Sequence, residues 1–269
     1  MNHDFGTVAF IGAGNMASAM IKGLVSAGIS SNRLLVSSRG DVNLQCLHQE
    51  YGIEVMQNNC VAASRADIII LATKPNVVVD VYKDIANVIK SDGVVVSVAA
   101  GITIKKFEDI LSDAIIVRAM PNVAAGVGQS ASVLYANNKS EQVKQSVSKL
   151  FSMMGSVHWL DKESDMSAAT ALAGSGPAYF YLQTEAMIAA GQDLGLSLDI
   201  ATALARQTLL GAANYLEKSE QSCKMLRDSI TSPNGTTAAA LRVMKERGVE
   251  AMMQEAMLAA WRRSEELKG

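Results

Sequence analysis

The stretch that most constrains the fold is Thr7 to Val25, where a short apolar run is followed by two closely spaced glycines and a helical pattern. Thr7 to Ile11 is rich in β-forming apolar residues and long enough for one buried strand. The run Gly12-Ala13-Gly14-Asn15-Met16-Ala17 comes next, and helical spacing begins at Ser18. This is the G-x-G-x-x-A form of the dinucleotide-binding fingerprint, in the strand-then-helix setting that it requires.

Each small residue of this fingerprint has its own physical reason. Gly12 permits the tight turn, Gly14 lets the backbone approach a pyrophosphate, and Ala17 keeps the helix close to the strand. The start of the helix then offers free N–H groups and a positive dipole end to the phosphates. An ordinary tight turn between a strand and a helix is the alternative. We expect cofactor contacts at Ile11, Gly12, Ala13, Gly14, Asn15 and Met16.

Composition excludes several other classes of protein. Apolar residues make up 49% and charged residues 19% of the 269 residues, so a large core is possible, and the net charge of −2 argues against a nucleic-acid partner. No run approaches the roughly 20 apolar residues of a membrane span, and the N-terminal residues do not resemble a signal peptide. The three cysteines are widely spaced and the three histidines scattered, so neither a disulfide framework nor a metal site is expected. We expect a cytoplasmic enzyme.

Further apolar runs alternate with helical patterns as far as Leu160. The expected strands are Arg33 to Ser37, Ile53 to Met56, Asp67 to Ala72, Val94 to Val98, Ala114 to Val117, Ser132 to Tyr135 and Val157 to Leu160. This alternation predicts an α/β fold with a Rossmann-type, doubly wound, mostly parallel sheet. Ligands of such sheets bind beyond the carboxyl ends of the strands, so the turns that follow the strands should converge on one cleft.

The residues after the second strand bear on the choice of cofactor. Enzymes that use NAD usually place an acidic residue there, whereas this chain has Ser37-Ser38-Arg39-Gly40. Hydroxyl groups and a guanidinium suit a 2′-phosphate, so Ser38 and Arg39 favour NADPH, with NADH possible. A solvated surface arginine is the alternative for Arg39, and a solvated turn residue is the alternative for Lys74.

The pattern changes after Leu160, where strands give way to helices rich in Ala, Met and Leu. We expect a dinucleotide-binding domain over residues 1–162 and an all-α domain over residues 163–269. Gly174-Ser175-Gly176 predicts a helix break, with Pro177 in the first turn of a new helix. The segment from Ala178 to Leu194 is apolar over most of its circumference and must be buried on several sides. We therefore expect a homodimer, or a larger homo-oligomer built on dimers, with this helix at its core.

A second informative stretch runs from Ser232 to Thr237. Ser-Pro-Asn-Gly is turn chemistry, and Thr236 and Thr237 then open a helix whose free N–H groups suit a carboxylate. An ordinary capped helix is the alternative. A β-branched residue in place of Gly235 would close the approach to this turn and resist any positive φ there.

This stretch resembles the signature of the pyrroline-5-carboxylate reductase family, Ser-Pro-Gly-Gly-Thr-Thr. Other motifs resemble those of the family in the same order along nearly the whole chain, namely Gly12 to Ala17, Lys74-Pro75, Ala99-Ala100-Gly101, Arg118 to Asn122 and Gly174 to Tyr179. The resemblance implies an NAD(P)H-dependent reductase that forms L-proline, with a dinucleotide-binding domain and a helical dimerisation domain. The small-molecule substrate would be 1-pyrroline-5-carboxylate.

The resemblance also assigns roles to residues. The turn would hold the substrate carboxylate and ring nitrogen through Ser232, Asn234, Gly235, Thr236 and Thr237. Thr237 and Glu220 would take part in catalysis, and Glu163 matches a second family acid near the substrate. Further cofactor contacts would come from Asn59, Ala72, Thr73, Lys74, Pro75, Ala99, Ala100 and Gly101.

The chain departs from the family pattern at a few positions. Asn234 stands where the family usually has glycine, and asparagine tolerates a left-handed conformation. Ser222-Cys223 replaces the usual His-Pro, and Val123 replaces a threonine. Two other functions remain open at this level. One is a related reductase of imines or small acids, and the other is a non-catalytic module that senses NADP(H).

Overall fold

The computed structural model describes residues 5–138 and 140–268, which form two compact units. The sheet unit runs up to Pro177 and includes the segment from Ala260 onward, and the helical unit is Ala178–Ala259. The division expected near residue 162 rests on a change of sequence pattern and stays a prediction.

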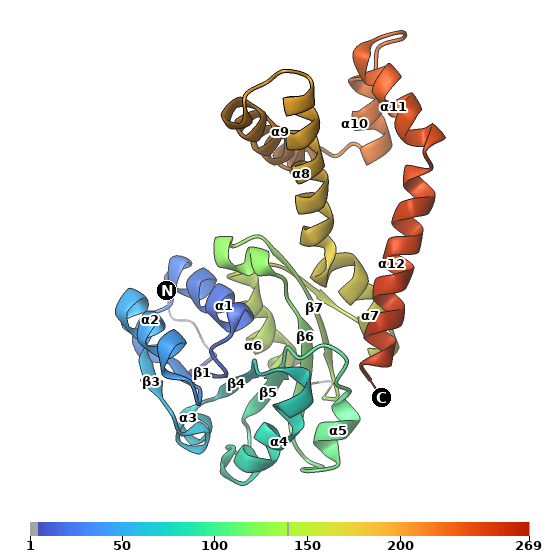
Figure 1. Ribbon diagram of the computed structural model, residues 1–269. Coiled ribbons are helices and arrows are strands. Elements are labelled where there is room, and N and C mark those ends of the chain that lie inside the picture. The colour runs from blue at the N-terminus through green and yellow to red at the C-terminus, as the bar shows by residue number, and fades with distance from the viewer. Residues whose placement is uncertain (1–4, 139, 269) are drawn as a thin grey trace. The chain divides into compact units, whose positions relative to one another are not determined.

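The sheet unit is built on one eight-stranded sheet with the order β3-β2-β1-β4-β5-β6-β7-β8 (Figure 1). Every neighbouring pair is parallel except β6 and β7. The predicted doubly wound, mostly parallel sheet is thus confirmed. Its strands are β1 (Val8–Ile11), β2 (Leu34–Ser37), β3 (Glu54–Met56), β4 (Ile68–Leu71), β5 (Val94–Ser97), β6 (Ile115–Met120), β7 (Ser130–Ala136) and β8 (Gly155–Trp159).

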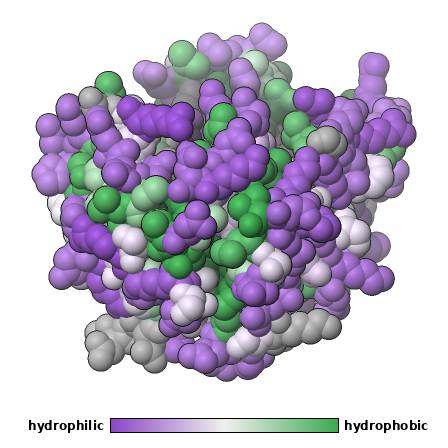
Figure 2. All heavy atoms as spheres, turned by 90° about the horizontal axis from the view of Figure 1, so that it is seen from below, coloured by the Kyte–Doolittle hydropathy of each residue, from purple (hydrophilic) through white to green (hydrophobic). Residues whose placement is uncertain are grey.

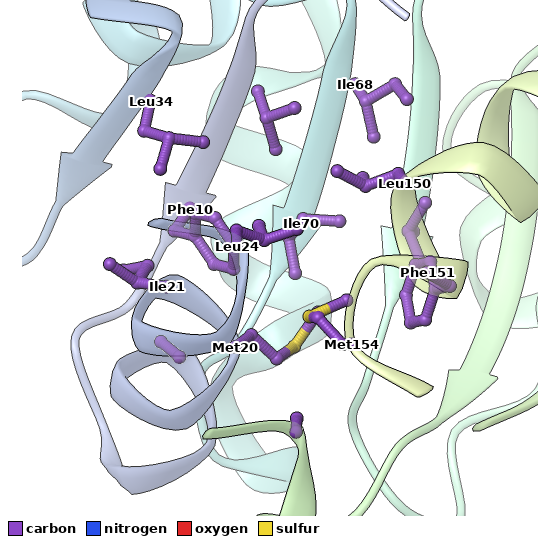
Figure 3. Packing of buried hydrophobic residues seen from close by; sticks show 14 of the residues in the cluster. Phe10, Met20, Ile21, Leu24, Leu34, Ile68, Ile70, Leu150, Phe151 and Met154 are labelled. Atoms are coloured by element: carbon purple, nitrogen blue, oxygen red, sulfur yellow. The ribbon is translucent and has the colours of Figure 1, made fainter. Parts of the chain in front are cut away.

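Helices lie on both faces of this sheet, because alternate residues of each central strand point to opposite faces. Phe10 of β1 and Ile70 of β4 belong to one buried cluster, with residues of α1, α2 and α6, whereas Ile11 and Leu71 belong to the other, with residues of α3, α4 and α5. Figure 3 shows the first cluster, in which Leu24 of α1 lies beside Phe10. The helices are α1 (Asn15–Ser26), α2 (Asp41–Tyr51), α3 (Asn59–Arg65), α4 (Pro75–Ile85), α5 (Ile104–Glu108) and α6 (Glu141–Ser152).

The connection to the helical unit has the expected interruption at Gly174-Ser175-Gly176. Helix α7 (Met166–Ala169) leads into a π-helical turn, Thr170–Gly174, and Ser175 forms a bend before α8 (Gly176–Asp193). Pro177 lies in the first turn of α8, as expected. The amide of Ser175 donates to the carbonyl of Thr170 at 2.9 Å, the five-residue spacing of a π-turn, which the sequence pattern does not predict.

The helical unit leaves much of its apolar surface uncovered within the chain. Its remaining helices are α9 (Leu198–Lys218), α10 (Cys223–Ser229), α11 (Thr236–Glu246) and α12 (Val249–Glu266), the last of which ends in the sheet unit. Tyr181 and Leu182 of α8 are 60% and 67% exposed. A groove between α8 and α9 is lined mostly by apolar side chains, among them Ile188 and Leu210. Exposed apolar surface of this extent is typical of a protein interface.

The face shown in Figure 2 is different in character. Hydrophilic side chains prevail on it, and hydrophobic ones are exposed between them in smaller groups. Such mixing is usual for a surface in contact with water. None of the helices in the described part of the chain is both long and apolar enough to cross a membrane.

Tyr82 of α4 provides a test of the core. Its ring is fully buried and makes an edge-to-face contact with Phe107, with the two ring centroids 5.1 Å apart. Burial raises the pKa of its phenol to about 12. Within residues 5–138 and 140–268 its hydroxyl has no hydrogen-bond partner. Tyr82→Phe keeps the ring and removes this unpaired group, so the free energy of unfolding should stay constant or rise by about 1 kcal/mol.

Urea unfolding of the wild type and the variant measures this change. Tyr82→Leu is the matched control, and it should lower the stability because it loses the aromatic contact. A loss of about 1 kcal/mol or more in Tyr82→Phe would mean that the hydroxyl is hydrogen-bonded.

Candidate active site

The turn between β1 and α1 is held against the end of β4. Gly12 has a φ of +111°, and a Cβ built on it would lie 2.6 Å from the carbonyl oxygen of Ala72. Its N–H donates to the carbonyl of Ser37 at 2.7 Å, which ties the turn to the end of β2 as well. A residue with a side chain would be unfavourable in place of Gly12 for two reasons. It would resist this φ, and its Cβ would have no room.

Helix α1 begins at this turn with its N-terminus uncapped by any side chain. Gly14 is the N-cap residue and makes no side-chain capping bond. A Cβ built on Gly14 would meet nothing within 4 Å, so the space above the helix start is open. Free N–H groups beside open space at a helix N-terminus suit a phosphate group.

A cavity of about 390 Å³ lies beside this turn. It collects side chains from the ends of β1 and β2 and from α3 and α4, which the sequence separates widely. Its lining residues are Ile11, Gly12, Ser37, Ser38, Arg39, Asn59, Thr73, Val77, Asp80 and Val81. Six of the residues expected to bind a cofactor, Ile11, Gly12, Ser38, Arg39, Asn59 and Thr73, are therefore brought together.

Two polar side chains of the cavity show that it suits a polar ligand. The Oγ1 atom of Thr73 is buried, and none of the described residues provides it with a hydrogen-bond partner. Ser37 is buried and donates its hydroxyl to Oδ1 of Asn59 at 2.7 Å, which fixes the orientation of that amide. An unpaired buried hydroxyl is costly unless a ligand pairs it. These groups fit a dinucleotide.

Arg39 lies at the outer rim of the cavity. Its side chain is 84% exposed, and its Nη2 atom is 3.9 Å from the carboxylate of Asp84. Asp80, one turn earlier on α4, lines the cavity itself. The guanidinium can therefore reach a phosphate at this rim, but two carboxylates are close enough to weaken its attraction for an anion.

The other expected cofactor residues lie at the carboxyl ends of β4 and β5. Lys74 is the N-cap residue of α4, and Pro75 takes the first helical position, for which proline is well suited. After β5, the N–H of Ala99 lies 3.4 Å from the hydroxyl of Ser97, and Gly101 has a φ of +79°. The parallel sheet thus places these turns along the same edge as Gly12.

In the helical unit, the turn before α11 has the conformation that a carboxylate site requires. Gly235 is the N-cap residue of α11 and makes no side-chain capping bond, so the first N–H groups of the helix are free. The N–H of Gly235 donates to the carbonyl of Ser232 at 3.0 Å, which closes the turn. Thr236 and Thr237 then occupy the first helical turn, as expected.

The left-handed residue of this turn is Asn234, with a φ of 58°, whereas Gly235 has a φ of −78°. Asparagine tolerates this conformation, so the departure from the family pattern preserves the turn. Gly235 is constrained by space instead, because a Cβ on it would lie 2.4 Å from the hydroxyl oxygen of Ser232.

Helix α10 explains a second departure from the family pattern. Ser222 is its N-cap residue and accepts a hydrogen bond from the N–H of Met225 at 3.3 Å, and Cys223 follows at the first position. Serine is among the best N-cap residues, so the helix still has a defined start. Glu220 precedes it and is exposed. At the other end of α10, hydrogen bonds from Lys224 and Arg227 lower the pKa of Asp228.

Glu163 does not share a unit with the other acid expected near the substrate. It lies in the sheet unit, where its Oε1 atom accepts hydrogen bonds from Nη1 of Arg118 and from the N–H of Ile104, both at 2.8 Å. Arg118 is only 3% exposed. No local pattern predicts this ion pair, because its partners are 45 residues apart in the chain.

Together, the open helix N-terminus, the polar cavity and the doubly wound sheet define a dinucleotide-binding protein of the Rossmann type. A family model described as "Pyrroline-5-carboxylate reductase dimerisation" matches residues 163–267, and one described as "NADP oxidoreductase coenzyme F420-dependent" matches residues 7–101.

Relatives that match nearly the whole chain identify the family. The chain is 40% identical to the pyrroline-5-carboxylate reductase of Pseudomonas aeruginosa, over 97% of this chain and 96% of that protein, and 35% identical to that of Pisum sativum, over the same shares. A pyrroline-5-carboxylate reductase structure from Coxiella burnetii is similar, with a TM-score of 0.91, 34% identity and coverage of 99% and 100%. The Plasmodium falciparum structure with NADP bound has a TM-score of 0.87, 30% identity and coverage of 99% of each chain. The chain belongs to the pyrroline-5-carboxylate reductase family.

Proposed function

We propose that this protein reduces the C=N bond of 1-pyrroline-5-carboxylate to form L-proline, the last step of proline biosynthesis, with NADPH as the preferred reductant and NADH as a weaker one. The observation that carries the proposal is the 33–40% identity to bacterial and plant pyrroline-5-carboxylate reductases over nearly the whole chain. The Rossmann-type cavity and the open helix N-terminus supply the binding chemistry that this reaction requires.

The reaction requires mainly that the protein hold the cofactor and the substrate in the correct positions. When bound, the reduced nicotinamide supplies the hydride that the imine carbon accepts, while the ring nitrogen gains a proton. In this proposal the N–H groups from Ala13 to Met16 hold the pyrophosphate, which the Gly12 turn lets approach. Ser38 and Arg39 face the 2′-phosphate, and Thr73 offers its buried hydroxyl. Asn59, held by Ser37, lies on the adenosine side.

The turn from Ser232 to Thr237 holds the substrate in this proposal. The free N–H groups at the start of α11 bind its carboxylate, and the Thr237 hydroxyl hydrogen-bonds to its ring nitrogen. Glu220 is the acid proposed near the substrate. The resemblance also places Glu163 near the substrate, but its contacts with Arg118 and Ile104 favour a different role.

The assembly proposed here is a homodimer, alone or as the unit of a larger oligomer, built on α8 and α9. The family model that covers residues 163–267 is described as a dimerisation domain, and these helices expose apolar side chains that none of the described residues covers. Cys46, Cys60 and Cys223 are all free, which suits the reducing environment of the cytoplasm.

Consumption of NADPH that depends on 1-pyrroline-5-carboxylate tests the proposal directly. The purified protein should oxidise NADPH only when the substrate is present and should release proline in equal amount. A parallel assay with NADH gives the cofactor preference. Absence of turnover with both cofactors, in a protein that is folded by circular dichroism, would contradict the proposed function.

Arg39→Asp should change the cofactor preference. The substitution removes the partner of the 2′-phosphate and supplies an acceptor for the ribose hydroxyls of NADH. NADPH should lose about 1.5 kcal/mol of binding relative to NADH, the low end for a bond between charged groups, because Arg39 is exposed and close to Asp84.

The ratio of kcat/KM for the two cofactors measures this change. Asp84→Asn is the matched control: it removes the competing charge, so it should shift the ratio slightly toward NADPH. An unchanged ratio in Arg39→Asp would exclude Arg39 as the phosphate partner.

A charge in the groove between α8 and α9 should disrupt the oligomer. Ile188 is half-buried there, and in the assembled protein an Ile188→Glu side chain would be buried without a partner. Sedimentation velocity over a range of protein concentrations should show a smaller species or weaker association. Val42→Glu is the control, since Val42 is 75% exposed and lies in α2 of the sheet unit, and it should leave assembly intact. A wild type that sediments as a monomer at all concentrations would contradict the proposed dimer.

The substrate turn should depend on conformation more than on side-chain identity. Asn234→Gly should be tolerated, because glycine adopts the same φ of 58° without strain. Gly235→Val should raise the KM for the substrate, because its branched side chain would collide with Ser232. NADPH binding should be retained in both variants, since the cofactor residues lie in the sheet unit.

Titration of NADPH fluorescence followed by measurement of the substrate KM separates the two effects. Equal loss of cofactor and substrate binding in Gly235→Val, with the fold intact, would mean that the turn is not a dedicated substrate site.

A further inference from the structure

The turn after β5, Ala99–Gly101, lies on the nicotinamide half of the proposed cofactor site. The sheet reverses its order between β1 and β4, and a dinucleotide lies across that point with one nucleotide on each side. Ser38 and Arg39 follow β2, on the side that would take the adenosine 2′-phosphate. The turn after β5 is therefore on the other side.

The ion pair between Arg118 and Glu163 fixes the point at which the chain leaves this turn and enters α5. Arg118 of β6 lies beside Ser97 of β5 in the sheet register, and its Nη1 atom is 2.8 Å from Oε1 of Glu163. The same Oε1 accepts from the N–H of Ile104, the first residue of α5. Since Ile104 is three residues after Gly101, the carboxylate holds the point at which the turn enters its helix.

The end of helix α12 packs against Gly101, the last residue of the turn. A Cβ built on Gly101 would lie 2.5 Å from Cβ of Leu267 and 2.7 Å from its carbonyl oxygen. The segment that carries Leu267 is anchored to the sheet unit by a hydrogen bond at 3.1 Å between the hydroxyls of Ser264 and Ser167. Glu265 of this segment has a lowered pKa because Lys268 and Ser167 hydrogen-bond to it, with a smaller effect from the charge of Arg118.

We propose that Glu163, paired with Arg118, and Leu267 hold the Ala99–Gly101 turn in the shape that receives the nicotinamide. Glu163 is then a positioning residue that acts through the backbone of this turn, and it does not bind the substrate. The inference rests on the proposed function for the identity of the cofactor. It predicts that loss of Glu163 affects the nicotinamide end of the cofactor site and leaves the adenosine end unchanged.

Two ligands separate these ends. NADP⁺ spans both, whereas adenosine 2′,5′-bisphosphate carries the adenosine with its 2′- and 5′-phosphates and no nicotinamide nucleotide. Glu163→Ala should weaken NADP⁺ binding by about tenfold, or roughly 1.4 kcal/mol, and leave the affinity for the bisphosphate within about twofold. Glu163→Gln should restore most of the affinity, because its amide oxygen still accepts from Ile104.

Isothermal titration of both ligands measures these affinities without turnover. Glu266→Ala is the matched control, since Glu266 is an exposed acid paired with Arg263 and should leave both affinities unchanged. If Glu163→Ala does not fold, Gly101→Ala tests the same turn, because its added Cβ would collide with Leu267, and it should also weaken NADP⁺ selectively.

Three outcomes would overturn the inference. Equal loss of both ligands would mean that the ion pair serves the fold alone. Unchanged binding of NADP⁺ would mean that the turn does not need it. A raised KM for the imine substrate with normal NADP⁺ affinity would make Glu163 a substrate ligand. Failure of the proposed function looks different, because the wild type would then bind both nucleotides normally but show no oxidation of NADPH dependent on the imine.

Discussion

The cofactor half of this protein depends on one close approach, that of the Gly12 turn to the end of β4. The turn has no room for a Cβ because the carbonyl of Ala72 would lie 2.6 Å from it. This contact brings the N-terminus of α1 over the sheet edge at the point where the strand order reverses. The N–H of Gly12 also bonds to Ser37, so the same turn aligns the ends of β1, β2 and β4. The cavity is a consequence of this alignment, since its side chains follow those strand ends.

The sequence predicts this half well because its signals are local. A short apolar run followed by two glycines specifies a strand, a turn and a helix within twenty residues, and the same alternation repeats along the chain. These patterns predict the sheet, its mostly parallel strands and most of the cavity residues. These patterns do not predict the roles of Ser37 and Asp84, because each role depends on a partner that only the folded sheet brings close.

Prediction was poorer where the structure depends on detail within a segment or on distant partners. No pattern in Thr170–Gly174 indicates a π-turn, because its hydrogen bonds differ from those of an α-helix only by a shift of one residue. At Gly235 the constraint is lack of space beside Ser232, which depends on the folded turn. The ion pair of Arg118 and Glu163 joins distant residues, so no periodic pattern predicts it.

The helical unit is governed by a different constraint, which is incomplete burial. The hydrophobic residues of α8 are spread around the helix, and several are exposed in the described part of the chain, so we propose that the stability of this unit depends on association. The turn before α11 is proposed as a substrate site from the family resemblance, because its physics alone also suits an ordinary helix start. Among the described residues no side chain caps α11, and the same holds for α1 at the proposed phosphate site.

The central claim is that the protein transfers a hydride directly from NADPH to an imine carbon. The most direct test uses NADPH that carries deuterium at the transferable position of the nicotinamide. With 1-pyrroline-5-carboxylate as the acceptor, the proline formed should carry one deuterium, on the ring carbon that the imine bond joined to nitrogen, and mass spectrometry with NMR locates it. Proline without deuterium, or no proline at all from a protein that binds NADPH, would contradict the account.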